Sequence, residues 1–290
     1  MQKIIVTGSK GLIGSKFVAA YEKQYEIISF DQSGEPSIDI TDKELLRQEI
    51  AKYSNVVAVL HLAAYTDVSG AYSQTGDKNG VAWQVNVEGT QHLADLCREF
   101  DLYLIHMSTA YVFDGDKQSL YFEEDEPKPI EWYGETKAEA EKKVLESGCK
   151  SVILRIDQPF SRDKFFKIDT LHRIINGLDD GTLYPQFTNH FFGPTYIEDL
   201  ARVIDFFVRK QLTGIYHASS GEKWSDYDFA WTVQELLDLP GKVKKADLDE
   251  YLKTLNRPYQ RNTAMDNQKL KAVIDFELKT IKEAIKETRL

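Results

Sequence analysis

The sequence is poor in cysteine, in long apolar runs and in clustered basic residues, and each shortage removes a class of protein. Its 290 residues include two cysteines, Cys97 and Cys149, whose spacing fits no metal-binding motif and gives no reason to expect a disulfide. We therefore expect no metal site. No apolar run is long enough to cross a membrane. Because Met1 leads directly into a predicted strand, we expect no signal peptide and a cytoplasmic protein.

Acidic residues outnumber basic ones by 46 to 36, which gives a formal net charge of −10. Without a basic block the chain is not expected to bind nucleic acid, so its expected partner is a small molecule. Tyrosine and phenylalanine, 15 of each, are numerous enough for a large core and a ring-lined cleft. The length suits one large α/β domain, alone or with a smaller lobe.

A glycine-rich turn near the start is typical of dinucleotide binding. Residues 3–7 form a short β-branched strand, and Gly8, Gly11 and Gly14 follow it before a helical stripe begins. Gly8 permits a tight turn, Gly11 lets the backbone approach phosphates, and Gly14 lets the helix pack against the strand. The helix start also offers free N–H groups to the pyrophosphate. A turn of this kind also occurs without any ligand, so the next strand matters.

The second predicted strand ends in Asp31, about 20 residues after the glycines, where an acid can bind the ribose hydroxyls of the adenosine. An acid there repels a 2′-phosphate and favours NAD. Lys10 acts in the opposite direction, because a cation could bind that phosphate, and NADP stays possible. The cofactor-binding residues predicted from this turn and strand are Gly8, Lys10, Gly11, Leu12, Ile13, Gly14 and Asp31.

Further buried strands alternate with helices along the chain. The strands are predicted at residues 56–64, 102–113, 151–156 and 214–219. The alternation predicts an α/β fold with a Rossmann-like, doubly wound parallel sheet. One helix is expected to begin with Thr41 as its N-cap and Glu44 at the capping-box position, and another to occupy residues 81–100. Residues 70–80 and 115–129 are expected to be loops, the second an acidic, solvated one.

The carboxyl ends of parallel strands are where open α/β sheets bind ligands. Small residues at the end of the third strand leave room for a ligand. Asp39 could lie near an adenine or be a solvated turn acid, while His61 is more consistent with a buried core histidine than with a catalyst. Asn86, a poor helix former, either makes a buried hydrogen bond near the cofactor cleft or is a tolerated polar residue. The additional cofactor contacts expected at strand ends are Asp39, Ile40, Ala63, Ala64 and Tyr65, and the substrate contacts are Thr66, Ser108, Thr109 and Ala110.

A tyrosine and a lysine four residues apart form the candidate catalytic pair. Tyr133 and Lys137 share one face of a predicted helix. An ammonium beside the phenol is expected to lower its pKa from about 10, giving a general acid or base able to work near neutral pH. Thr109, at a strand end just upstream, can hold the substrate oxygen beside them. Arg257 or Arg261 could clamp a phosphate, or both could be surface arginines.

Several segments together resemble the extended short-chain dehydrogenase/reductase family. They read TGSKGLIG, HLAAYTDV, WQVNVEGT, HMSTAYVFDG, YGETK and GPTYIEDLA. Within that family, IDITD, STAYVFDG and RPYQRNTAMDNQKL are most similar to the dTDP-4-dehydrorhamnose reductases. The resemblance implies that Thr109, Tyr133 and Lys137 are catalytic, that Tyr133 and Lys137 also contact the cofactor, and that hydride comes from a dihydronicotinamide. It also implies a homodimer formed through residues 81–100 and 133–146.

The chain departs from that family where a sugar or nicotinamide would bind. Ala110 replaces an aspartate, Gln158 lies where a tryptophan is usual, and RPYQRNT replaces RPxxS. The same Ala110 disfavours a 4,6-dehydratase, which needs an acid pair there. Gln158 and Arg257 are kept as expected substrate contacts.

Three functions follow from the sequence. The first is NAD(P)H-dependent reduction of a nucleotide-linked 4-keto sugar, with Tyr133 as proton donor. The second is epimerisation of a nucleotide sugar with tightly bound NAD. The third is a cofactor-binding regulatory subunit without turnover. Residues 1–156 with 194–219 are expected to bind the dinucleotide, and residues 157–193 with 220–290 to form the substrate lobe.

Overall fold

A computed structural model describes residues 1–288, and these residues form two compact units. None of the helices in this described part is long and apolar enough to cross a membrane. The first unit consists of Met1–Val112, Glu131–Leu154 and Ala201–Ile215, and the second of Phe113–Ile130, Arg155–Leu200 and the chain from Tyr216 onward.

The first unit is built on a parallel sheet, as the alternating pattern predicted. Within residues 1–288 it is the largest sheet, with six strands in the order β10-β5-β4-β3-β1-β2. Strand β1 pairs in parallel with β2 and with β3, and β3 pairs in parallel with β4. The strands are β1 (Lys3–Thr7), β2 (Glu26–Phe30), β3 (Val56–His61), β4 (Tyr103–Thr109), β5 (Ser151–Ile156) and β10 (Gly214–His217).

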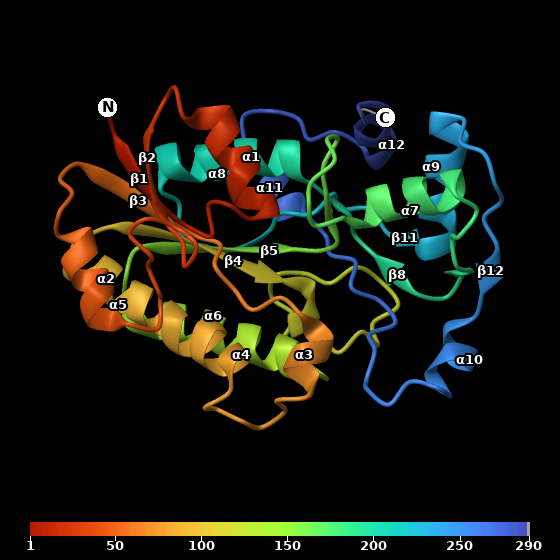
Figure 1. Ribbon diagram of the computed structural model, residues 1–290, viewed down its shortest axis with the longest axis horizontal. Helices are drawn as coiled ribbons and strands as arrows, with labels where there is room; N and C mark the ends of the chain where they lie inside the picture. The colour runs from red at the N-terminus through yellow and green to blue at the C-terminus, as the bar shows by residue number, and fades with distance from the viewer. Residues whose placement is uncertain (289–290) are drawn as a thin grey trace. The chain divides into compact units, whose positions relative to one another are not determined.

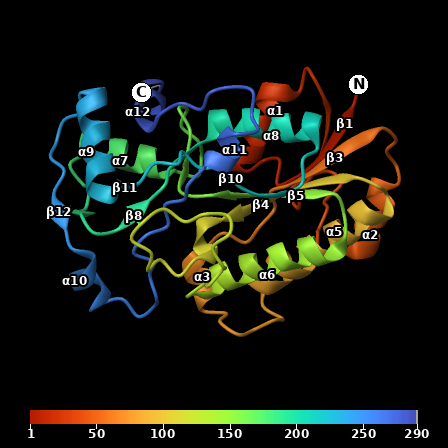
Figure 2. The ribbon, with the colours of Figure 1, turned by 180° about the vertical axis from the view of Figure 1, so that it is seen from behind.

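Helices cover both faces of this sheet, which explains why its strands are near-continuous apolar runs. In Figure 1, α1 (Leu12–Tyr21) and α8 (Ile197–Lys210) lie on one face. Seen from behind in Figure 2, α2 (Lys43–Ile50), α5 (Thr90–Glu99) and α6 (Trp132–Ser147) lie on the opposite face of the sheet. The core packs strand residues against these helices, among them Ile5, Val59, Leu104, Ile153, Leu93 and Val144.

Three local predictions need correction. The helix expected over 81–100 is helical throughout but not uniform, because α4 (Val81–Trp83) and α5 are joined by a π-helical segment, η1 (Gln84–Gly89). The loop expected at 70–80 begins inside a short helix, α3 (Val68–Tyr72), capped by Asp67. The cap of α2 is Asp42 and not Thr41, because Thr41 donates its N–H and its hydroxyl to Asp39.

The second unit has its own core under short paired strands. These are β6 (Pro159–Phe160) with β9 (Thr195–Tyr196), β7 (Gln186–Phe187) with β12 (Lys245–Ala246), and β8 (Phe191–Phe192) with β11 (Trp224–Ser225). Phe229 makes edge-to-face contacts with Phe160 and Phe192, at centroid distances of 5.9 and 5.4 Å. The helices of this unit are α7 (Thr170–Asp179), α9 (Asp226–Leu237), α10 (Leu248–Leu252), α11 (Gln268–Lys271) and α12 (Ile281–Lys286).

Candidate active site

The glycine turn between β1 and α1 is packed so closely that side chains do not fit. Gly8 has a φ of 69°, and a Cβ added there would lie 2.9 Å from the backbone nitrogen of Ala63. A Cβ on Gly14 would lie 2.3 Å from the Gly8 carbonyl oxygen. Gly11 is the N-cap of α1 and no side chain of the described residues caps it. The first N–H groups of α1, from Leu12 onward, are therefore available for an anionic ligand.

Asp31 lies beside this turn and is held by it. The hydroxyl of Ser9 donates to the Asp31 carboxylate, which fixes the acid at the end of β2. The Lys10 ammonium donates to the carbonyl oxygen of Ser33 at 2.7 Å, so Lys10 reaches the loop that follows Asp31. Both groups proposed to select between NAD and NADP thus lie at one edge of the turn.

Asp39 and Ile40 follow in the same loop, and they have different surroundings. Asp39 accepts hydrogen bonds from Thr41 and Gln32, which hold the pKa of its carboxyl below its usual value despite partial burial. Ile40 is buried, and a Cβ on Gly89 would lie 2.7 Å from its Cδ1 atom. This close approach explains the glycine within the helical stretch.

Two sets of buried hydrogen bonds fix the end of β3, one made by His61 and one by the Thr7 hydroxyl. His61 lies between Thr7 and Thr90, at 2.8 and 2.9 Å, and burial lowers its pKa to about 3. It is the satisfied core histidine that the sequence indicated. The Thr7 hydroxyl also accepts the backbone N–H groups of Leu62 and Ala63. The turn into Ala64 is therefore fixed by hydrogen bonds to β1.

Asn86 makes the buried hydrogen bonds that its position in a helix indicated. Its side-chain oxygen accepts from the Tyr65 N–H at 2.8 Å, and its amide group donates to the Tyr65 carbonyl and to the Thr136 hydroxyl at 2.9 Å. Asn86 belongs to the π-helical segment, a feature often found at functional sites. One side chain thus connects the loop after β3 to helix α6.

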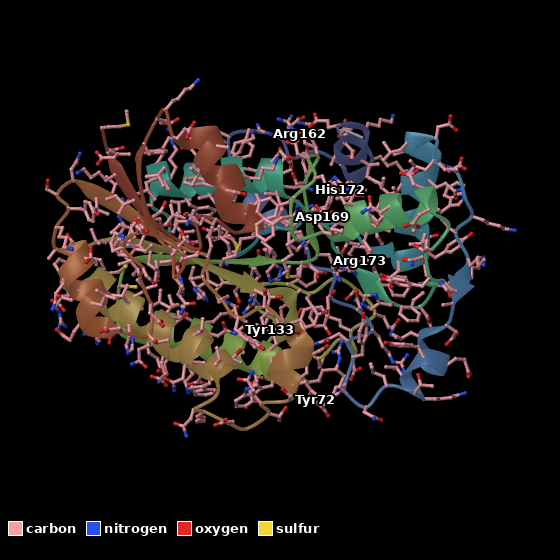
Figure 3. All side chains as sticks on the ribbon, in the orientation of Figure 1. Tyr72, Tyr133, Arg162, Asp169, His172 and Arg173 are labelled. Atoms are coloured by element: carbon pink, nitrogen blue, oxygen red, sulfur yellow. The ribbon has the colours of Figure 1, made fainter. Side chains whose placement is uncertain are left out.

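Helix α6 carries the candidate catalytic pair in its first turns, where Figure 3 labels Tyr133. Glu131 caps the helix, and its carboxylate accepts from the backbone N–H groups of Tyr133 and Gly134 at 2.9 and 2.7 Å. The Thr109 side chain hydrogen-bonds to Tyr133. Lys137 is 3% exposed, and its ammonium donates to the carbonyl oxygen of Met107 at 2.7 Å.

The electrostatics of Tyr133 differ from the sequence prediction. Burial and the nearby Glu131 carboxylate raise the pKa of the Tyr133 phenol, and the Thr109 hydrogen bond lowers it only in part. Burial lowers the pKa of Lys137 to about 8 while Glu141 raises it. The prediction that Lys137 lowers the pKa of Tyr133 is therefore wrong here. The phenol is a neutral group that can donate a proton at neutral pH.

The other expected substrate residues are distributed over both units. Thr66 is exposed after β3, Ala110 is fully buried at the start of a short 3-10 turn (Ala110–Val112), and Ser108 is buried and donates to Glu141. Gln158 and Arg257 belong to the second unit.

Within the second unit, the three polar candidates have local partners. Gln158 has a positive φ of 38° and accepts a hydrogen bond from the Thr170 hydroxyl. The Arg257 guanidinium lies 5.3 Å from the centre of the Tyr259 ring, and Arg261 forms an ion pair with Asp249.

Sequence reasoning did not single out Glu131 or Glu141, although both are buried beside the Tyr133–Lys137 pair. The signal was present for Glu141, since it follows Lys137 by four residues and so lies on the same helix face. Glu131 immediately precedes the helix, in the N-cap position that polar side chains favour.

Comparison with known proteins identifies the family. The family model described as RmlD substrate binding domain matches residues 1–289. The chain belongs to this family. A dTDP-4-dehydrorhamnose reductase of Aggregatibacter actinomycetemcomitans is 29% identical over 303 residues, covering all of this chain and 99% of that protein. The mouse (Mus musculus) methionine adenosyltransferase 2 subunit beta is 24% identical over 310 residues, covering 99% of this chain and 87% of its own length.

A solved structure confirms the fold. The dTDP-4-dehydrorhamnose reductase of Bacillus anthracis in complex with NADP superposes with a TM-score of 0.88 over 98% of both chains, at 23% identity. This similarity confirms the predicted Rossmann-like fold, and together with the family match it confirms the predicted resemblance to extended short-chain dehydrogenases/reductases.

Proposed function

We propose that the protein is an NAD(P)H-dependent reductase of a nucleotide-linked 4-keto sugar, of the dTDP-4-dehydrorhamnose reductase type. The observation that carries the proposal is a neutral, half-buried Tyr133 phenol hydrogen-bonded to Thr109, with the buried Lys137 one turn along α6. The same unit contains the glycine turn. Membership of the RmlD family and the similarity to a dTDP-4-dehydrorhamnose reductase support the substrate class.

The residues at the turn fit a dinucleotide, because Gly8 and Gly14 let the turn pack tightly against its own backbone and the start of the loop that follows β3, and the start of α1 beside it is uncapped. Asp31 would bind the adenosine ribose and Lys10 a 2′-phosphate if one is present. The NADP complex of the B. anthracis reductase and the NAD complex of the similarly folded Thermus thermophilus UDP-glucose 4-epimerase support a nicotinamide cofactor of either kind. The residues proposed to hold it are Gly8, Lys10, Gly11, Leu12, Ile13, Gly14, Asp31, Asp39, Ile40, Ala63, Ala64, Tyr65, Tyr133 and Lys137.

The reduced nicotinamide, when bound, supplies hydride to the keto carbon of the sugar. Tyr133 donates its phenolic proton to the carbonyl oxygen, a transfer for which a neutral phenol is the correct form. The Thr109 hydroxyl positions that oxygen beside Tyr133. The Lys137 ammonium stabilises the negative charge that remains on the phenol oxygen after the proton has left.

We further propose how the rest of the chain takes part. Residues 1–156 with 194–219 would bind the dinucleotide, and residues 157–193 with 220–290 the sugar nucleotide. A homodimer would form through residues 81–100 and 133–146, where Val81 and Leu145 are large apolar side chains more than half exposed. The protein would act in the cytoplasm. The residues proposed to contact the substrate are Thr66, Ser108, Thr109, Ala110, Gln158 and Arg257.

A regulatory subunit without turnover is the second candidate, and the similarity to methionine adenosyltransferase 2 subunit beta favours it. Such a protein would bind the dinucleotide without reducing a sugar. The two candidates therefore differ in turnover and not in cofactor affinity.

The test begins with mass and absorbance measurements on the purified protein, followed by titration with NADH and NADPH. Reversible binding and consumption of NADH with a dTDP-linked 4-keto sugar are expected for the reductase. Tyr133→Phe should keep cofactor affinity and lose at least about 10²-fold in turnover. Tyr53→Phe, before β3 and away from the pair, is the matched control and should retain full activity.

Each other outcome has a distinct meaning. Tightly retained NAD with a change of sugar configuration would indicate an epimerase. Cofactor binding without turnover on any 4-keto sugar nucleotide would indicate the regulatory subunit. Absence of binding to either cofactor would mean that the glycine turn is structural only.

A further inference from the structure

Two consecutive residues of β4 hold two oppositely charged side chains of α6. Met107 accepts a hydrogen bond from the Lys137 ammonium through its carbonyl oxygen, and Ser108 donates its hydroxyl to the Glu141 carboxylate at 2.5 Å. Lys137 and Glu141 are four residues apart and lie on the same face of the helix. Each is 3% exposed. The strand therefore fixes a buried cation and a buried anion side by side.

Among the other titratable groups near Lys137, the Glu131 carboxylate acts on Tyr133, and Glu141 is the carboxylate that acts on Lys137 itself. The rings of His61 on β3 and His106 on β4 lie at a centroid distance of 5.2 Å with their planes tilted by 38°, and burial together with Lys137 keeps the pKa of both rings low. Both imidazoles are therefore neutral at pH values where the protein works. Tyr133, on the same helix, is a neutral phenol. An ammonium in such surroundings is costly unless a carboxylate compensates it.

We propose that Glu141 is a positioning residue which, fixed by Ser108, supplies the buried negative charge that keeps Lys137 protonated and in place beside Tyr133. The inference rests on the proposed function only for the part that Lys137 plays in catalysis. The electrostatic effect of Glu141 on Lys137 does not depend on the proposed function. Burial lowers the pKa of Lys137 to about 8, and Glu141 is the carboxylate that opposes this fall. Glu141 contacts neither substrate nor cofactor in this assignment, so it acts through Lys137.

The experiment follows the protonation of Lys137 directly. Protein labelled with [ε-¹³C]lysine is titrated by NMR, and the Lys137 signal is assigned by its loss in Lys137→Arg. The wild-type midpoint is expected near 8, well separated from ordinary lysines at about 10.4. In Glu141→Gln the midpoint should fall to about 7 or below, because desolvation is then unopposed. As the pH is raised, turnover of Glu141→Gln should decline at a lower pH than turnover of the wild type.

Matched variants separate this effect from a general loss of charge or structure. Glu135→Gln removes an exposed carboxylate from the first turn of the same helix and should leave the midpoint near 8. Glu141→Asp keeps the negative charge, so its Lys137 midpoint should lie close to the wild-type value. Ser108→Ala keeps both charges but releases Glu141, so it should produce a smaller fall.

An unchanged Lys137 midpoint in folded Glu141→Gln would overturn the proposal. If Glu141→Gln does not fold, Ser108→Ala decides, and an unchanged midpoint there has the same meaning. The titration needs no substrate, so it can succeed even if no 4-keto sugar is reduced, and it can fail in an active reductase. The two proposals are thus tested separately.

Discussion

Asn86 offers the most informative single substitution in the first unit. Its side chain makes three hydrogen bonds, two with the backbone of Tyr65 and one with the Thr136 hydroxyl. Thr136 lies between Tyr133 and Lys137 on α6, while Tyr65 follows the strand end proposed to contact the cofactor. Asn86→Ala would remove the connection between these two parts of the site without touching either catalytic side chain.

The expected cost can be worked out from those three bonds. Each contributes about 1 kcal/mol net, and the Tyr65 N–H and the Thr136 hydroxyl lose a buried partner, so the sum is about 3 kcal/mol. Alanine is a better helix former than asparagine and returns roughly 0.5 kcal/mol. The net loss of about 2.5 kcal/mol should lower Tm by about 5 °C in a chain of this size. Turnover should fall roughly 10-fold or more, because α6 is less precisely placed.

The assay combines thermal unfolding with hydrogen exchange at the Tyr65 amide. That amide donates to Asn86, so its protection should decrease sharply in Asn86→Ala. Gln84→Ala is the matched control, because Gln84 lies in the same π-helical segment and makes an exposed hydrogen bond to the Lys78 carbonyl. The reasoning is refuted if Asn86→Ala leaves both Tm and the Tyr65 amide protection at the values of the control.

Two further predictions concern cofactor choice and acid stability. Asp31→Ala should relax discrimination against NADPH in a titration with both cofactors, and an unchanged preference would mean that Lys10 or another group sets the selectivity. Neither ring nitrogen of His106 has a hydrogen-bond partner among residues 1–288, and burial keeps the pKa of this imidazole well below its usual value. The folded protein therefore loses stability as the pH falls through about 6.5, because histidine in the unfolded chain binds a proton there. His106→Leu should therefore retain about 2 kcal/mol more stability than wild type at about pH 5, measured by urea unfolding; an equal acid loss in both proteins would contradict this.

The order of strands and helices could be predicted from sequence because the sheet is parallel and buried on both faces. Strands such as 151–156 then appear as apolar runs with sharp ends, and β5 has these same bounds. Helix boundaries were less accurate where side chains compete for the same backbone group. Threonine is a residue type that favours the N-cap position, but the Thr41 hydroxyl donates to Asp39, and Asp42 caps α2 instead.

Burial of acidic residues was the main feature that sequence did not indicate. Glu123 lies in an acidic run expected to be solvated, yet it is buried and accepts the backbone N–H of His217. Glu141 and the exposed Glu135 are likewise both glutamates of α6, and only the packing of α6 against β4 makes the first buried and leaves the second exposed. Such burial depends on contacts between distant segments, which local composition does not contain.

The two buried acids near the active-site end of α6, Glu131 at its N-cap and Glu141 within it, stabilise two different protonated groups. Glu131 stabilises the protonated Tyr133 phenol, and Glu141 stabilises the protonated Lys137 ammonium. Oxidation of an alcohol requires Tyr133 to begin as a phenolate, which burial and Glu131 both oppose. Reduction of a ketone requires it to begin as a phenol and to end beside a cation, which is the arrangement found here. An epimerase must run both half-reactions at one site, so this pair of protonation states favours the reductase.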